Sequence, residues 1–272
     1  MTKTTLNKKM RVFDGEIAIA AAQLYLAHML QRTLPVGFIV PCLPTKTDKL
    51  PSGSQWLHEI KHDGLRTTMS FYAERFLPLL IDLSMRNKRL HPYRERTAGA
   101  AEGRVLDIGI GSGLNLPFYA QKAAEIFGLD PSLPLLARAQ SKASRRQTPV
   151  HLIEGSAERI PLADRSMDTI VMTWTGCSIP EIFAALEEMR RVLKPCGRLL
   201  FVEHGRAPEP RVARWQDRLN PLWQRFSGGC RLNRKIDDLL SDAGFQIDRL
   251  TTGYIPGPKI MTFFYEGSAM PR

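Results

Sequence analysis

The 272-residue sequence is poor in cysteine and contains no long uninterrupted apolar run. The cysteines are scattered through the chain, and no two of them form a C-x-x-C pair; they are Cys42, Cys177, Cys196 and Cys230. This spacing indicates neither a zinc site nor a disulfide framework. We therefore expect no metal, and a reducing, cytoplasmic location fits the composition.

The most apolar stretch, residues 17–30, is interrupted by Gln23 and His28. A transmembrane helix needs about 20 apolar residues, so this stretch is too short to span a bilayer. Basic residues precede it, as in a signal peptide, but Asp14, Glu16 and the lack of a small-residue cleavage site argue against that interpretation. A helix packed on the protein and a helix lying on a membrane surface both stay open.

Basic residues outnumber acidic ones, 38 to 27, for a formal net charge of +11. Residues 1–70 contribute nine basic and five acidic side chains, or +4, and the remainder contributes +7. A positive protein favours anionic partners such as nucleic acid or an acidic membrane surface. The charge is spread along the chain, however, and does not form a single basic arm.

The N-terminal part, residues 1–71, carries a motif of its own. The run Glu-Ile-Lys-x-Asp-Gly-x-Arg at 59–66, with Pro-Cys-Leu-Pro at 41–44, resembles the nucleotidyl-lysine motif of ATP-dependent DNA ligases. The resemblance implies that Lys61 attacks the α-phosphate of ATP. It covers only residues 38–71, and an isolated lysine is mostly protonated at neutral pH. We therefore expect a small N-terminal appendage with an inactive ligase-like fragment.

A glycine-rich turn dominates the second part of the chain. Residues 105–113 read Val-Leu-Asp-Ile-Gly-Ile-Gly-Ser-Gly. The apolar residues predict a strand buried on both faces. Glycines at 109, 111 and 113 allow a tight turn and the close approach of a ligand. A helix predicted over 114–122 would direct its N-terminal amides at that ligand.

Two acidic residues narrow the choice of ligand. Asp130 follows Gly113 by 17 residues, at the end of a predicted strand, where an acid can reach ribose hydroxyls. Asp107, just before the turn, would repel the pyrophosphate of a dinucleotide but suits an ammonium or sulfonium group. S-adenosylmethionine carries both groups and a ribose, without phosphate. A glycine-rich turn that binds nothing is the alternative.

Predicted strands and helices alternate along residues 72–272, which indicates a parallel sheet covered on both faces. The predicted strands are 104–108, 124–129, 150–154, 168–173, 197–203, 245–250 and 259–265. The predicted helices include 114–122, 132–145 and 179–193, and another ends near Ala243. We expect a single α/β domain over 72–272.

Several motifs in this part resemble those of class I S-adenosylmethionine-dependent methyltransferases. They are the turn at 106–113, Asp130, the loop at 154–161 and the turn at 191–197. The resemblance implies a Rossmann-like, doubly wound, seven-stranded and mostly parallel sheet whose last strand is antiparallel. It also implies S-adenosyl-L-methionine as cofactor, bound by Asp107, Gly109, Gly111, Gly113, Asp130, Ala157, Glu158 and Thr173.

Residues 173–179, 201–204 and 220–230 resemble a narrower methyltransferase-like group that includes animal thiol methyltransferases of the endoplasmic reticulum. The likeness implies a small-molecule or lipid acceptor bearing a thiol or an amine. Peripheral membrane contact is possible on this reading, no stable nucleic-acid complex is expected, and the oligomeric state is open.

Three residues at the ends of the predicted fourth and fifth strands are candidates for catalysis, because open α/β sheets bind ligands there. His204 can deprotonate a thiol or amine near neutral pH, or it can orient a loop instead. Cys177 is a second candidate, with an inert packed thiol as the alternative. Glu203 either touches the acceptor or pairs locally.

A long connection over 204–235 carries aromatic residues among arginines, notably Trp215, Trp223 and Phe226. It predicts either a lid with an apolar inner wall and a basic outer face, or aromatics packed on the core.

Three other functions compete with methyl transfer to a small acceptor. They are a nucleic-acid methyltransferase, a non-catalytic S-adenosylmethionine-binding protein and a nucleotidyltransferase acting through Lys61. A DNA methyltransferase that modifies amino groups would carry an Asn/Asp-Pro-Pro-Tyr motif. The chain has none at the expected place, because the fourth predicted strand is followed by Thr-Trp-Thr at 173–175.

Overall fold

The structure is a computed structural model that describes residues 77–272. The ligase-like fragment at 38–71, its Lys61, the apolar stretch at 17–30 and the predicted boundary at residue 71 lie outside the described residues. Within the described part, no helix combines the length and the apolar composition that crossing a bilayer demands.

A seven-stranded sheet forms the centre of the described domain, with the strand order β3-β2-β1-β4-β5-β7-β6. The first five strands are parallel to one another, and β7 runs antiparallel to both of its neighbours. The strands are β1 (Gly103–Ile108), β2 (Ala123–Asp130), β3 (Val150–Glu154), β4 (Met167–Thr173), β5 (Leu193–His204), β6 (Phe245–Tyr254) and β7 (Phe263–Pro271). This arrangement confirms the predicted Rossmann-like fold.

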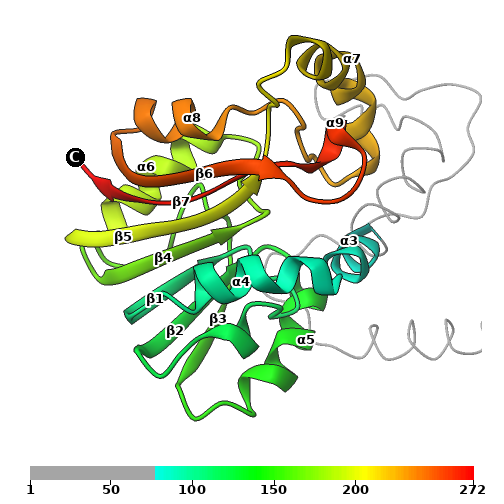
Figure 1. Ribbon diagram of the computed structural model, residues 1–272. Coiled ribbons are helices and arrows are strands. Elements are labelled where there is room, and N and C mark those ends of the chain that lie inside the picture. The colour runs from blue at the N-terminus through cyan, green and yellow to red at the C-terminus, as the bar shows by residue number, and fades with distance from the viewer. Residues whose placement is uncertain (1–76) are drawn as a thin grey trace, which may run out of the picture. The chain divides into compact units, whose positions relative to one another are not determined.

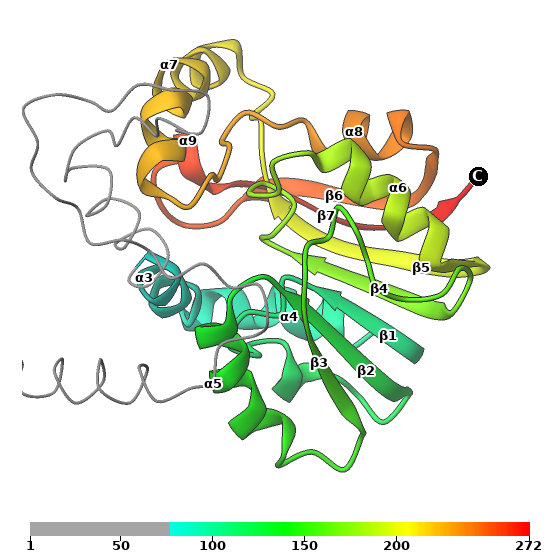
Figure 2. The same cartoon turned by 180° about the vertical axis from the view of Figure 1, so that it is seen from behind.

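Helices cover both faces of the sheet, as Figures 1 and 2 show from opposite sides. One apolar core joins the sheet to α6 and α8, and a second joins it to α4 and α5. The helices are α3 (Leu77–Met85), α4 (His91–Ala98), α5 (Leu133–Ala143), α6 (Ile182–Val192), α7 (Pro210–Phe226), α8 (Ile236–Asp242) and α9 (Lys259–Thr262). Two short 3-10 turns, η2 (Lys88–Leu90) and η3 (Leu116–Phe118), complete the element list.

Successive side chains of β1 point to opposite faces of the sheet, so this strand contributes to both apolar cores. Val105 packs in the core with α4 and α5, whereas Leu106 and Ile108 pack in the core with α6 and α8. Every one of these side chains is at most 1% exposed. Residues 105–108 of β1 are therefore apolar on both sides of the sheet, apart from Asp107, and they fix the position of the glycine turn that follows.

The helix predicted over 114–122 is wrong. This segment contains turns and the single 3-10 turn η3 instead. Pro117 has no N–H with which to continue an α-helical ladder. In addition, the Asn115 side chain is committed to hydrogen bonds with Asp107 and Thr173. The glycine turn is therefore followed by no α-helix whose N-terminus could face a ligand.

The strand predicted over 259–265 is only partly correct. Residues 259–262 form the one-turn helix α9, and β7 begins at Phe263. The strand then enters the sheet between β5 and β6, pairing His204 with Phe264 on one side and Tyr254 with Phe263 on the other.

Candidate functional site

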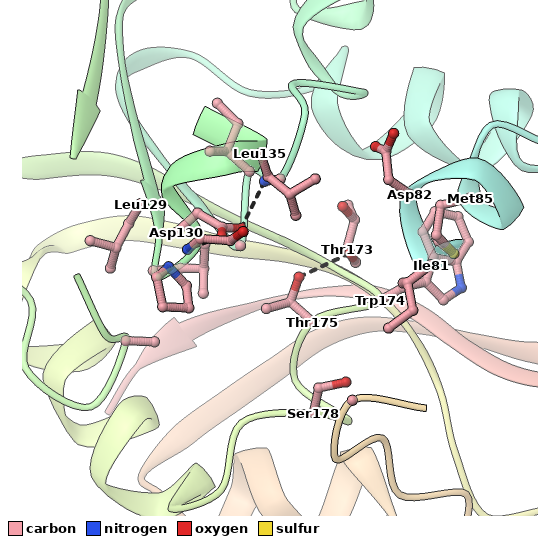
Figure 3. A pocket seen from close by; sticks show the side chains of 18 of the residues that line it. Ile81, Asp82, Met85, Leu129, Asp130, Leu135, Thr173, Trp174, Thr175 and Ser178 are labelled. Carbon is pink, nitrogen blue, oxygen red and sulfur yellow. Dashed lines mark hydrogen bonds between the residues drawn. The ribbon is translucent and has the colours of Figure 1, made fainter. Parts of the chain in front are cut away.

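A cavity of about 400 Å³ opens at the carboxyl ends of β1, β2 and β4. The strand order places β1 and β4 side by side although β2 and β3 intervene in sequence, so the cavity lies at the topological switch point of the sheet. Figure 3 shows Leu129 and Asp130 facing it from one side and Asp82 and Met85 of α3 from the other. Its volume is within the range of small-molecule sites.

Asp130 ends β2 and lines this cavity. Its Oδ2 accepts a hydrogen bond from the Gly111 amide at 2.9 Å, and its Oδ1 accepts one from the Ser132 amide at 2.8 Å. These two amides fix the carboxyl group, and each oxygen keeps a lone pair for a further donor. Burial raises the pKa of Asp130 despite these hydrogen bonds. The carboxyl group is thus positioned to accept two hydroxyl donors from the cavity.

The three glycines of the turn have different roles. All three have positive φ, between 55° and 74°, which a glycine adopts without strain. A Cβ at Gly109 would collide with the Thr175 side chain, and one at Gly113 would collide with Leu116. At Gly111 the nearest atom would be 3.9 Å away, so the space beside its backbone is open. Gly109 and Gly111 line the cavity, whereas Gly113 permits packing beneath it.

Asp107 does not line the cavity, although the sequence analysis assigned it to the cofactor. It is fully buried and accepts hydrogen bonds from Asn115 Nδ2 at 3.0 and 3.2 Å. Asn115 also donates to Thr173 Oγ1 at 2.9 Å and accepts from Arg94 Nη1 at 3.4 Å. Asn115, Thr173 and Arg94 line the cavity, so Asp107 orients residues that face a ligand and does not face one itself.

Burial raises the pKa of Asp107 from 3.8 to about 7. The folded state therefore holds this proton in a pH range where the unfolded chain has lost it. The contribution of Asp107 to stability is complete below pH 3.8 and declines as the pH rises to about 7. We expect the free energy of unfolding to fall over this window by up to about 1.4 kcal/mol per pH unit relative to Asp107→Asn.

Chemical denaturation at several pH values, without added ligand, measures this slope. Asp242→Asn changes an exposed carboxyl group and should keep the wild-type slope. Equal slopes in wild type and Asp107→Asn would show that Asp107 has no raised pKa in the folded state.

Ala157 and Glu158, both predicted to bind the cofactor, have different positions in the structure. Ala157 lines the cavity near Leu129 and Leu135, which gives that end an apolar wall. Glu158 does not line it. Its Oε1 accepts a hydrogen bond from the Glu181 amide at 2.8 Å, and its Oε2 accepts one from Ser156 Oγ at 2.8 Å. Glu158 therefore holds the loop that carries Ala157.

None of the three predicted catalytic residues lines the cavity. Glu203 is fully buried and accepts backbone N–H bonds from Thr175, Gly176 and Cys177 at 2.8, 2.9 and 3.3 Å. The local pairing considered in the sequence analysis therefore describes Glu203 in this structure. Burial raises its pKa, and the three amides act in the opposite direction.

Cys177 and His204 meet a third residue, Cys230, behind the loop that lines the cavity. His204 Nε2 lies 2.9 Å from Cys230 Sγ, and Cys177 is 2% exposed. The neighbouring Cys177 thiol and burial raise the pKa of Cys230. The structure thus brings two predicted site residues together, but away from the place where a ligand would lie.

Several cavity residues were absent from the predicted set. Asp82 comes from α3, accepts a hydrogen bond from Ser112 Oγ and forms an ion pair with Arg86 at 2.7 Å. Trp174 lines the cavity with a φ of 52°, which is rare for a bulky residue, and Arg94 lies 4.8 Å from the centre of its ring. The position of Trp174 directly after a predicted buried strand could have identified it as a cavity residue from the sequence. No sequence pattern singled out Asp82.

Of residues 204–235, which were predicted to form a lid, only Gly228 lines the cavity. Trp215 and Phe226 are 54% and 59% exposed, so the alternative of aromatics packed on the core does not hold for them either. Trp223 instead donates a hydrogen bond from Nε1 to Cys230 Sγ at 3.3 Å.

Comparisons with known proteins agree with this geometry. Residues 106–201 match the family model described as "Methyltransferase domain". Human "Thiol S-methyltransferase TMT1B" is 31% identical over 153 residues, which cover 55% of this chain and 62% of that protein. The phosphatidylethanolamine N-methyltransferase of Cereibacter sphaeroides is 36% identical over 116 residues, covering 41% and 57%. The chain thus spans less than two thirds of the length of these relatives.

Among solved structures, a Thermotoga maritima protein described as a SAM-dependent methyltransferase and possible histamine N-methyltransferase superposes with a TM-score of 0.56. It is 21% identical, and the match covers 75% of this chain and 100% of that chain. This likeness concerns the fold. Together, the comparisons show that residues 106–201 are similar to methyltransferase domains and that the described sheet shares its fold with the Thermotoga maritima protein.

Proposed function

We propose that this chain transfers the methyl group of S-adenosylmethionine to a small, largely apolar thiol. The observation that carries the proposal is the position of Asp130, a buried carboxyl group held by two amides at the edge of a cavity beside an open glycine backbone. The methyltransferase domain over 106–201 supports the same chemistry.

The described residues suit each part of the cofactor. Asp130 can accept hydrogen bonds from both ribose hydroxyls, and a carboxylate acceptor makes such bonds strong. Leu129, Leu135 and Ala157 offer an apolar surface to the adenine ring. The backbone at Gly109 and the Asn115 side chain supply polar groups for the amino-acid end. The absence of a basic phosphate-binding cluster among the cavity residues agrees with a ligand that has no phosphate.

S-adenosylmethionine supplies, when bound, a methyl group on a sulfonium centre. The remaining contribution falls to the chain, which must hold an acceptor in line with that group. Orientation of this kind can contribute about 7–11 kcal/mol. Ile81, Met85 and Trp174 form an apolar wall on the α3 side of the cavity, where such an acceptor would be held and water excluded.

The described part of the cavity wall offers no neutral nitrogen or sulfur base to take a proton from the acceptor. Among the described residues that line it, no histidine, cysteine or lysine occurs, and the acidic side chains are Asp82 and Asp130. A thiol has a pKa near 8.5, so a few per cent is thiolate at neutral pH and reacts without a base. An alkyl amine is almost fully protonated there, which favours the thiol.

Transfer of radiolabelled methyl groups tests the proposal. The full-length chain is incubated with labelled S-adenosylmethionine and, separately, with small apolar thiols, phosphatidylethanolamine vesicles and oligonucleotides. We expect label in the thiol product, at a rate that rises about tenfold per pH unit below the thiol pKa. A matched alcohol of the same shape should receive no label.

Labelling of the lipid or the oligonucleotide with none in any thiol would contradict the thiol assignment while keeping methyl transfer. Calorimetric titration separates a wrong acceptor from a wrong activity. If S-adenosylmethionine does not bind at all, the proposal fails as a whole.

A further inference from the structure

Three potential metal-ligand side chains converge from segments that are distant in sequence. Cys177 lies in the loop after β4, His204 ends β5, and Cys230 follows α7. Their ligand atoms all lie within 4.8 Å of one another. Cys177 is 2% exposed, and the other two are partly buried. The convergence stands apart from the cavity, since none of the three lines it.

Polar groups surround the two thiols. Trp223 Nε1 donates a hydrogen bond to Cys230 Sγ at 3.3 Å. The Arg234 guanidinium is 7% exposed and donates to the Gly176 carbonyl and, at 2.7 Å, to the Ile179 carbonyl, on either side of Cys177. The nearby Glu203 carboxyl is occupied by three backbone amides.

We propose that Cys177, His204 and Cys230 bind a zinc ion. Two sulfur ligands and one imidazole form a donor set that zinc uses in proteins, with a fourth position left for water. In a tetrahedral site with Zn–S near 2.3 Å and Zn–N near 2.0–2.1 Å, ligand atoms lie about 3.6–3.8 Å apart. The observed spacing reaches this geometry with shifts on the order of 1 Å or less.

The surrounding hydrogen bonds suit a metal-bound thiolate. Binding converts both thiols to thiolates and releases their two protons to solvent, while His204 coordinates as the neutral imidazole. The Trp223 N–H then points at a thiolate sulfur, as groups around metal ligands commonly do. The ion joins the loop at 174–178, which forms part of the cavity wall, to the segment after α7.

Metal analysis and cobalt substitution test the site without any methyl acceptor. Full-length protein purified without chelator should contain about one zinc ion per chain. After chelation and exchange into cobalt(II), it should show near-ultraviolet bands from thiolate-to-cobalt charge transfer. Zinc should displace cobalt and raise the melting temperature of the chelated protein.

Variants locate the site. We expect Cys230→Ser and His204→Gln to weaken zinc binding by more than about 100-fold, and Trp223→Phe, which replaces the indole and its N–H donor by a smaller ring, by about 10–100-fold. Cys196→Ser, at an exposed thiol, should bind zinc as the wild type does.

Two results would overturn the proposal. The first is no zinc in the purified protein together with no charge-transfer band after cobalt addition. The second is a Cys177–Cys230 disulfide, found by mass spectrometry in protein purified under reducing conditions. If Cys230→Ser does not fold, the wild-type cobalt spectrum and the Trp223→Phe titration still decide the question. Loss of methyl transfer with intact zinc binding would count against the proposed function and leave this site standing.

Discussion

Asp130→Ala should lower the affinity of the chain for S-adenosylmethionine by about 100-fold or more. A hydrogen bond to a charged acceptor contributes about 1.5–3 kcal/mol, and the substitution removes the acceptor proposed for two ribose hydroxyls. Calorimetric titration of the variant with S-adenosylmethionine measures the loss. Methyl transfer should fall in parallel at cofactor concentrations below saturation.

The same carboxyl group also accepts the Gly111 and Ser132 amides, so a change in folding must be separated from a change in binding. Asp130→Asn retains one carbonyl oxygen and should lose less affinity, about tenfold. Asp242→Ala removes an exposed carboxyl group and should bind normally. Unchanged affinity in a folded Asp130→Ala protein would show that the ribose lies elsewhere.

Glu203→Ala should destabilise the protein by roughly 3–5 kcal/mol, because it leaves three backbone N–H groups without their buried acceptor. In a domain of this size the melting temperature should fall by roughly 10 °C. Glu203→Gln keeps one acceptor oxygen, so its melting temperature should lie between those of the wild type and Glu203→Ala. Thermal unfolding of the ligand-free protein provides the measurement.

This substitution also separates a structural role for Glu203 from a catalytic one. Glu187→Ala, at an exposed position of α6, serves as the matched control and should melt as the wild type does. A Glu203→Ala protein with normal stability and no methyl transfer would favour the catalytic role that the sequence predicted.

Local patterns in the sequence predicted much of the fold correctly. The strand predicted over 104–108 and its glycine turn predicted the cavity edge, and the spacing to Asp130 predicted a carboxyl group on it. The helix predicted over 114–122 did not form, because Pro117 and the hydrogen bonds of Asn115 oppose it. Pro117 was visible in the sequence, whereas the hydrogen bonds of Asn115 become apparent only once Asp107 and Thr173 are known to lie beside it.

The candidate catalytic residues show a different limit of sequence reasoning. Strand ends at one edge of a sheet predict which residues are neighbours, but not whether their side chains face a cavity. Glu203 and Cys177 lie at the predicted edge, but neither lines the cavity. Likewise, cysteine spacing could not show that Cys177 and Cys230 lie together, because they are 53 residues apart and meet only through the fold.

The position of β7 has a consequence for how the chain folds. Because β7 lies between β5 and β6, the strand β5 can complete its hydrogen bonding only after 58 further residues, 205–262, have been traversed. Contacts of such long range slow folding. Until β7 docks, β5 presents an unpaired edge rich in apolar residues, which is the kind of surface on which partly folded chains associate with one another. A strand that is exposed to association during folding is therefore covered on both sides in the finished sheet.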